Sequence, residues 1–188
     1  MKIGIFVGSF NPPHKGHINI INHLINNNIL DKIIVVPTGN YWDKQDLIDI
    51  KDRINMLKFF ESEKIIIDNK HNDIKYTYQI MKDFSKEYKT DQLSLIIGAD
   101  NIINFNKWKN YQELLKYNLI IMPRNNIDIS KYLIEYHIKN YLIIDNYPYI
   151  DISSTIIRNK INNKYLDKRV LNYIKENKLY LKRGIYEN

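Results

Sequence analysis

The sequence predicts an α/β fold in which helices cover both faces of a parallel sheet, a doubly wound arrangement. Short apolar runs of strand length alternate along the chain with segments whose apolar residues recur at helical spacing. The apolar runs are continuous, which is typical of strands buried on both faces. Strands that alternate with helices in this way lie parallel and are joined by right-handed crossovers. Ligands bind such sheets beyond the carboxyl ends of the strands, so we expect the functional site there.

Each predicted element rests on its own apolar pattern. Strands are predicted over residues 3–7, 33–36, 65–67, 93–97, 119–122 and 142–144. Helices are predicted over residues 18–25, 49–60, 76–88, 110–116, 130–137, 153–159 and 167–177. We find no internal repeat, low-complexity linker or change of composition, and therefore expect a single domain over residues 1–188.

Composition narrows the class of protein. A chain of 188 residues with 44% hydrophobic residues has room for a sizeable core and is unlike a disordered chain. Its apolar runs are far shorter than the roughly 20 residues needed to span a bilayer, and its apolar start is too brief for a signal peptide. The absence of cysteine excludes disulfides and thiolate metal sites. We expect a cytoplasmic protein without membrane partners.

The net charge of +7 allows two interpretations. Nucleic-acid binding is one of them, but basic residues are interspersed with acidic residues and asparagine and form no dense cluster. We therefore expect no nucleic-acid partner. A positive field would also steer ATP and other phosphorylated substrates to the protein. The sequence leaves the oligomeric state open, a homo-oligomer included.

The segment that follows the first predicted strand has the parts of a phosphate site. Residues 8–13 form a turn by composition and lead into a helix, whose positive end and free N–H groups favour an anion. His14 and His17 are three residues apart, a spacing that can place both on one face of the helix start. Gly16 leaves room for a ligand to approach the backbone. We expect polyphosphate binding; the alternative is a pair of solvated or helix-capping histidines.

The segment after the fourth predicted strand, residues 96–108, also carries candidate binding residues. Gly98 permits a close approach of the backbone, and Asp100 could accept hydrogen bonds from ribose hydroxyls or simply cap a helix. Trp108 offers a flat face to a heteroaromatic ring, although packing in the core is its ordinary role.

The loop after the second predicted strand, residues 37–44, contains polar side chains suited to phosphate. Asn40 and Lys44 could contact phosphate, and Tyr41 and Trp42 could cover a base. An ordinary surface loop with two partly buried aromatic residues is the alternative, and the position beyond a strand end favours function.

Two separated motifs resemble those of a known superfamily. GSFNPPHKGH, residues 8–17, resembles the G-x-F-x-P-x-H-x-G-H signature of the nucleotidyltransferase superfamily. ISSTIIR, residues 152–158, resembles its second signature, I-S-S-T-x-I-R. Members join a nucleoside monophosphate unit to a phosphate. The resemblance implies a Rossmann-like doubly wound parallel sheet of the nucleotidyltransferase type.

Central segments narrow the resemblance to one branch, the nicotinate-nucleotide adenylyltransferases. IIGAD followed by K-W resembles that branch, as do DRINMLKFF, YTYQIMKDF and IIMPRNN, so that the likeness spans residues 2–179. It implies transfer of AMP from ATP to nicotinate mononucleotide, which gives deamido-NAD and pyrophosphate in NAD biosynthesis.

The resemblance also implies roles for single residues. His14 and His17 would bind the ATP phosphates, with His17 more important in the transition state, and Arg158 would complete the catalytic set. Ser153, Ser154 and Thr155 would hold the β- and γ-phosphates beside Arg158, and Gly8, Ser9, Phe10, Gly16, Gly98 and Asp100 would complete the ATP site. The acceptor site would comprise Asn40, Lys44, Thr77, Trp108, Lys109 and Arg124.

Phosphoryl-type transfer depends on positioning and charge neutralisation more than on a protein nucleophile. We expect a magnesium ion held mainly by the ATP phosphates, because Mg²⁺ keeps several waters and needs no dedicated protein cage. No protein metal site is therefore expected.

Two departures from the pattern keep alternatives open. Asn11 stands where the first motif most often has Asp, and the loop after Asn40 is Y-W-D-K instead of the usual P-P-H-K. A different acceptor, nicotinamide mononucleotide or phosphopantetheine, is therefore an alternative, although Lys109 could pair with a nicotinate carboxylate. A non-catalytic nucleotide-binding sensor is the alternative from another class, because one fold hosts many functions.

Overall fold

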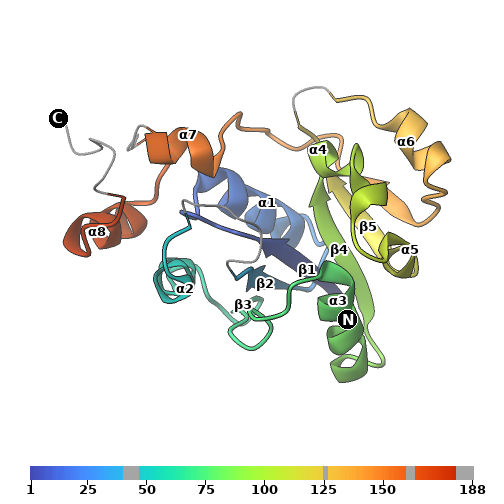
Figure 1. Cartoon of the computed structure of the whole chain (residues 1–188), viewed down its shortest axis with the longest axis horizontal. Helices are drawn as coiled ribbons and strands as arrows, with labels where there is room; N and C mark the ends of the chain where they lie inside the picture. The colour runs from blue at the N-terminus through green and yellow to red at the C-terminus, as the bar shows by residue number, and fades with distance from the viewer. Residues whose placement is uncertain (40–46, 125–126, 160–163, 181–188) are drawn as a thin grey trace.

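Six parallel strands form one sheet in the order β3-β2-β1-β4-β5-β6 in the computed structural model, which describes residues 1–39, 47–124, 127–159 and 164–180 (Figure 1). The strands are β1 (Lys2–Gly8), β2 (Lys32–Pro37), β3 (Ile65–Ile67), β4 (Gln92–Gly98), β5 (Asn118–Met122) and β6 (Tyr141–Ile143). The predicted doubly wound sheet and its six strands are confirmed, with bounds shifted by only a few residues.

Helices follow the strands as the apolar spacing predicts. They are α1 (Lys15–Asn26), α2 (Ile50–Lys58), α3 (Thr77–Glu87), α4 (Ala99–Ile102), α5 (Tyr111–Leu114), α6 (Ser130–Glu135), α7 (Ser154–Asn159) and α8 (Lys168–Glu176). The helix α4 and the 3₁₀ turn η1 (Phe105–Lys107) lie within residues 96–108, beyond the fourth predicted strand, where the sequence analysis predicts no helix.

The order of the strands reverses beside β1. The chain builds outward from β1 through β2 to β3, and then returns to pair β4 with the other edge of β1. Such a reversal opens a crevice at the carboxyl ends of the two central strands, because their connections leave toward opposite faces. The segments after β1 and β4 therefore meet at this edge.

Side chains of the central strands point alternately to two apolar layers, as the pleat requires. Ile34 and Val36 pack toward α3, α4, α5 and α6, whereas Ile33 and Val35 pack toward α1 and α2. A third apolar cluster, which includes Met56, Ile157 and Val170, joins α2 to α7 and α8. Figure 1 shows α2, α7 and α8 at one end of the molecule and α4, α5 and α6 at the other.

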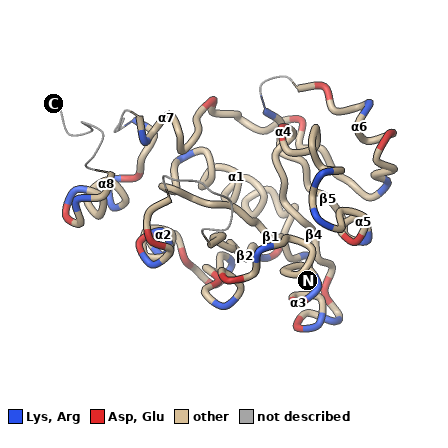
Figure 2. Tube along the Cα trace, viewed as in Figure 1, with Lys and Arg blue, Asp and Glu red and all other residues tan. Residues whose placement is uncertain are grey.

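Charged side chains lie on the outside of this framework. Figure 2 shows basic and acidic residues interleaved along the helices, which agrees with the interspersed charges of the sequence. Within the described ranges, the structure contains no helix with the length and apolar character needed to cross a membrane.

Candidate active site

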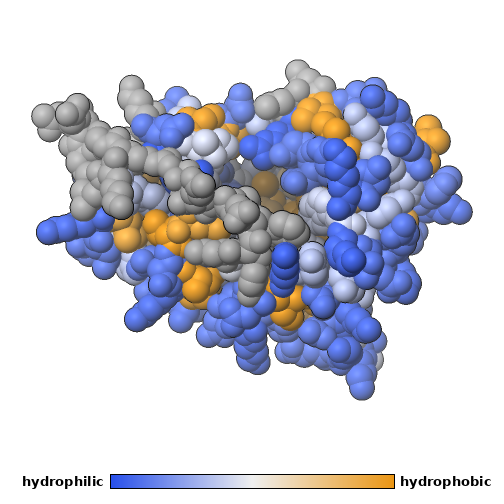
Figure 3. Space-filling model, viewed as in Figure 1, coloured by the Kyte–Doolittle hydropathy of each residue, from blue (hydrophilic) through white to orange (hydrophobic). Residues whose placement is uncertain are grey.

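A cavity of about 730 Å³ lies at the carboxyl edge of the sheet, where the connections after β1, β4, β5 and β6 meet. Figure 3 shows the surface hollowed near the middle of this face, between the regions that Figure 1 labels α7 and α4. The predicted ATP-site residues that line the cavity are Ser9, His14, Gly16, His17, Gly98, Asp100, Ser153, Ser154, Thr155 and Arg158.

Gly8 and Phe10, also predicted for the ATP site, do not line this cavity and instead shape the loop that carries the histidines. Phe10 has a φ of 45°, in the left-handed region that non-glycine residues rarely adopt. Its ring is buried and lies edge-on to the His17 ring at 4.9 Å. The packing of Phe10 therefore fixes an unfavourable backbone conformation beneath the imidazole.

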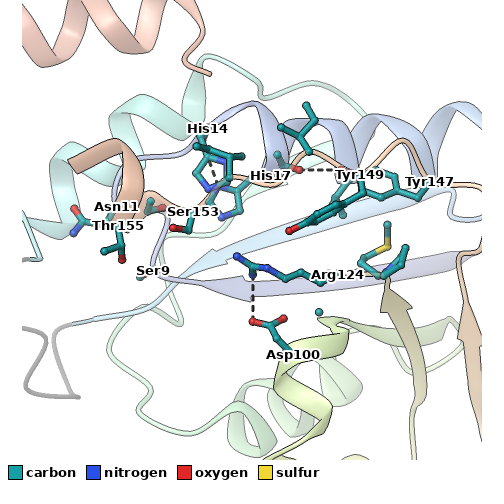
Figure 4. Close-up of a pocket in the computed structure, with 18 of the residues that line it drawn as sticks. Ser9, Asn11, His14, His17, Asp100, Arg124, Tyr147, Tyr149, Ser153 and Thr155 are labelled. Carbon is teal, nitrogen blue, oxygen red and sulfur yellow. Dashed lines mark hydrogen bonds and ion pairs between the residues drawn. The ribbon is translucent and has the colours of Figure 1, made fainter. Parts of the chain in front are cut away.

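The two histidines stack at the start of α1. His14 is the N-cap residue and His17 the third residue of the helix, and their ring centroids are 3.7 Å apart with planes 26° from parallel (Figure 4). The backbone N–H of His14 donates a hydrogen bond to His17 Nδ1 at 3.3 Å. In neutral His17 the proton therefore lies on Nε2, which remains a donor for a ligand.

Both imidazoles are neutral at pH 7 in this structure. Burial and the positive charge of Arg124 lower the pKa of His14 from 6.5 to about 3. Burial, His14 and Arg124 together hold the pKa of His17 well below 6.5. An ordinary histidine titrates near neutral pH, but burial beside a guanidinium disfavours the charged form of both rings. His14 Nδ1 is buried and has no hydrogen-bond partner within the described residues, so a ligand atom could satisfy it.

Gly16 is required by close packing. A Cβ atom at this position would lie 2.9 Å from His14 Cε1 and 3.1 Å from Ile152 Cγ2. The Gly16 carbonyl also accepts a hydrogen bond from the hydroxyl of Tyr147 at 3.2 Å. The absent side chain thus lets the histidine ring and the segment after β6 approach the helix.

Arg124 reaches across the cavity from the end of β5. Its Nη1 contacts Asp100 Oδ2 at 3.3 Å, and Figure 4 shows the guanidinium between Asp100 and His17. Asp100 is the second residue of α4, whose N-cap is Gly98. Asp100 Oδ1 is buried without a partner among the residues that the structure describes. The cavity therefore contains an ion pair with an unsatisfied carboxylate oxygen.

The second signature meets the first through hydrogen bonds. Arg158 Nη1 donates to the carbonyl of Asn11 at 2.9 Å, and Arg158 Nη2 donates to Thr155 Oγ1 at 3.2 Å. Ser154 Oγ donates to the carbonyl of Pro12 at 3.0 Å. The imidazoles and the distant guanidinium thus line one cavity, as expected, and Arg158 and Ser154 also hold the backbone of the opening loop.

A buried arginine in α2, which the sequence analysis gave no role, holds the same loop from its other side. Arg53 is fully buried, and its Nη1 donates to the carbonyls of Ser9 and Thr38, each at 2.7 Å. Its Nε donates to the carbonyl of Ile48 at 3.2 Å. Burial lowers the pKa of Arg53, although a guanidinium keeps its proton in proteins. The sequence offers one sign of this burial: Arg53 lies on the apolar face of the predicted helix, at helical spacing from Ile50 and Leu57.

A second cavity of about 350 Å³ contains part of the predicted acceptor site. Val7, at the end of β1, lines it together with Thr38, Lys75, Tyr76, Thr77, Ile80, Lys107, Trp108 and Lys109. The Trp108 ring also packs against Phe105 at 5.4 Å, so this residue serves both the core and the cavity wall.

The other predicted acceptor residues lie elsewhere. Arg124 lines the first cavity with the ATP candidates and does not line the second. Asn40 and Lys44 lie outside the described residues, as do Tyr41 and Trp42. Tyr147 and Tyr149, which line the first cavity, were missed because the segment after β6 shows no periodic pattern.

Comparisons with known proteins agree with this geometry. The family model described as Cytidylyltransferase-like matches residues 5–160. A protein of Borreliella afzelii named probable nicotinate-nucleotide adenylyltransferase is 37% identical over 199 aligned residues, which cover 97% of this chain and 96% of the relative. A protein of the same name from Flavobacterium psychrophilum is 32% identical over 197 aligned residues, which cover 97% of this chain and all 100% of the relative.

Solved structures show the same fold. Nicotinic acid mononucleotide adenylyltransferase of Plasmodium falciparum, complexed with NaAD, superposes with a TM-score of 0.81 at 24% identity. The superposition covers 95% of this chain and 97% of the other. At this identity the likeness concerns the architecture alone.

Proposed function

Because the chain belongs to the cytidylyltransferase-like family and, within it, to the nicotinate-nucleotide adenylyltransferases, we propose that it transfers AMP from ATP to nicotinate mononucleotide. The products are deamido-NAD and pyrophosphate. One observation carries the proposal: the stacked histidines, Arg124 and Arg158 line a cavity at the strand-order reversal, and a second cavity with an aromatic wall opens at the same sheet edge.

The first cavity would hold ATP. The acceptor phosphate attacks the α-phosphorus in line, forming a new P–O bond while the bond to the β-phosphate oxygen breaks and pyrophosphate leaves. Neutral His17 donates a hydrogen bond from Nε2 to the developing charge, a preorganised contact of the oxyanion-hole type. The guanidinium groups of Arg124 and Arg158 supply positive charge at the cavity wall.

The nucleoside end of ATP would lie toward α4. Asp100 Oδ1, buried without a partner in the described part of the chain, is suited to accept a hydrogen bond from a ribose hydroxyl. The ion pair with Arg124 orients this carboxylate, because it engages the other oxygen, Oδ2.

The second cavity would take the acceptor. Trp108 supplies a face on which a pyridine ring stacks. Lys75, Lys107 and Lys109 line this cavity, and no Asp or Glu does so among the residues described. This positive lining favours an acceptor that carries a ring carboxylate as well as a phosphate.

We also propose that Mg²⁺ enters with ATP. The described residues hold no group of three or more histidine or acidic side chains that could bind a metal ion, so its oxygen ligands would come mainly from the phosphates. When bound, the ion would neutralise charge on the departing pyrophosphate.

The acceptor assay tests the proposal. Purified protein is incubated with ATP and Mg²⁺ and with nicotinate mononucleotide, nicotinamide mononucleotide or phosphopantetheine, and pyrophosphate is measured. We expect the highest kcat/KM with the nicotinate form. Equal values for acid and amide would overturn the choice of acceptor while adenylyl transfer stands. No pyrophosphate with any acceptor would favour a nucleotide-binding sensor.

Lys109 gives a sharper test of acceptor choice. Lys109→Met removes one of the positive charges of the second cavity, so we expect a lower ratio of kcat/KM for acid to kcat/KM for amide. Lys116→Met is the matched control, because Lys116 lies outside both cavities and pairs with Glu113 at 2.7 Å. An unchanged ratio in Lys109→Met would show that Lys109 does not help the protein to distinguish acid from amide acceptors.

A further inference from the structure

The loop that carries the histidines depends on contacts from far along the chain. Its backbone is unfavourable at Phe10, where φ is 45°, and such a conformation persists only where the surrounding structure holds it in place. Asn11, the next residue, is only 1% exposed although its side chain is polar. Its partners therefore decide whether the loop keeps its shape.

Tyr180 supplies a partner to this buried amide. Its hydroxyl donates a hydrogen bond to Asn11 Oδ1 at 2.8 Å, and the N–H of Ile48 reaches the same oxygen at 3.4 Å. The neighbouring carbonyl of Asn11 accepts from Arg158, so the C-terminal part of the chain holds both oxygens of this residue. Burial raises the pKa of the Tyr180 hydroxyl, so it remains a proton donor throughout the physiological range.

Tyr180 is held in place by its own surroundings. It follows α8 and packs, together with Leu179, on the apolar cluster that joins α2, α7 and α8. The N–H of Leu179 donates to the carbonyl of Ile174, which fixes the turn that leaves the helix. The hydroxyl therefore reaches Asn11 from a packed framework and not from a free tail.

We propose that Tyr180 is a positioning residue for the ATP site, which acts through Asn11 on the loop that bears His14 and His17. This proposal rests on the proposed function. Tyr180 lines neither cavity, but its hydroxyl bonds Asn11, which lines the first cavity. Asn11 does not line the second cavity, where the acceptor would bind. We therefore expect an effect of Tyr180 on ATP and not on the acceptor.

Tyr180→Phe tests the proposal, because it keeps the ring and removes only the hydroxyl. We expect kcat/KM for ATP and the affinity for ATP alone to fall between about threefold and tenfold, the size of one lost hydrogen bond. The KM for the acceptor should stay unchanged. Equal loss toward ATP and acceptor, or no loss at all, would overturn the proposal.

Tyr173→Phe is the matched control. Tyr173 lies on α8, and its hydroxyl bonds Asp52 at 2.8 Å and Asn55 at 2.9 Å, away from the loop. Both variants should lose a similar amount of stability against heat, whereas only Tyr180→Phe should change the kinetics toward ATP. The same kinetic change in both would show a general structural effect and refute the positioning role.

A double-mutant cycle isolates the bond itself. Asn11→Leu removes the accepting oxygen, so adding Tyr180→Phe should cause no further loss of ATP affinity. Additive losses would overturn the proposal. Because ATP affinity is measured by calorimetry without acceptor, the inference is tested even where the unsubstituted protein forms no deamido-NAD, an outcome that would reject the proposed function alone.

Discussion

The buried histidine pair makes the stability of the fold depend on pH in a way that His14→Gln should reveal. His14 is 5% exposed, and its pKa is about 3 in the folded chain against 6.5 for an ordinary histidine. Below pH 6.5 the unfolded chain therefore binds a proton at this position that the folded chain rejects. The contribution of neutral His14 to the free energy of unfolding is therefore fully present above pH 6.5 and is lost as the pH falls toward 3.

The magnitude follows from linkage. Each pH unit in this window removes about 1.4 kcal/mol from the free energy of unfolding, so His14 alone accounts for a loss of about 2 kcal/mol between pH 6.5 and pH 5. His17 acts in the same direction, because its pKa is also lowered. In His14→Gln the contribution of position 14 disappears. The difference in unfolding free energy between wild type and variant should shrink by about 2 kcal/mol between pH 7 and pH 5.

Urea unfolding at pH 7, 6 and 5 and constant ionic strength measures this difference. His137→Gln is the control, because His137 is exposed and reports what replacing any histidine does. A wild-type minus His14→Gln difference that stays constant over this range would refute the burial argument, and with it the neutral state assigned to the histidine pair.

Three further predictions concern catalysis. His17→Ala should lower kcat by about 10²–10³-fold, the usual cost of losing a preorganised donor to developing charge, and unchanged turnover would reject that role. Trp108→Ala should raise the KM for the acceptor more than the KM for ATP, because Trp108 lines only the second cavity; equal effects would contradict the stacking role. Gly16→Ala should lower kcat/KM for ATP about tenfold or more, since its Cβ would displace the His14 ring or Ile152, and wild-type kinetics would show that the helix start yields without cost.

The architecture was predictable because each strand is a continuous apolar run and each long helix has a regular apolar face. The helix α4 and the turn η1 were missed for a physical reason: with four and three residues, neither completes the turns that make a period visible. Their positions matter, since α4 carries Asp100 into the first cavity and η1 precedes Trp108 in the second.

The site was predictable where motifs are local and less so where contacts cross the chain. The sequence analysis proposes His14, His17 and Asp100 as candidates from their positions after strands, and all three line one cavity. Other contacts join segments far apart in sequence. Arg124 pairs with Asp100, and Arg53 donates hydrogen bonds to the carbonyls of Ser9 and Thr38. No pattern of single residues encodes such pairings. Burial, which sets the charge of the histidines, is likewise visible only in three dimensions.

The connection between the two ends of the chain has a consequence for its synthesis. The last strand of the sheet ends at Ile143, whereas Ser154, Arg158 and Tyr180 hold the loop next to the first strand. A ribosome therefore makes every strand and both histidines before it makes the groups that lock them into a working arrangement. A product released early at residue 150 would contain all six strands that the structure describes, but it would lack Ser154, Arg158 and Tyr180, which hold the loop.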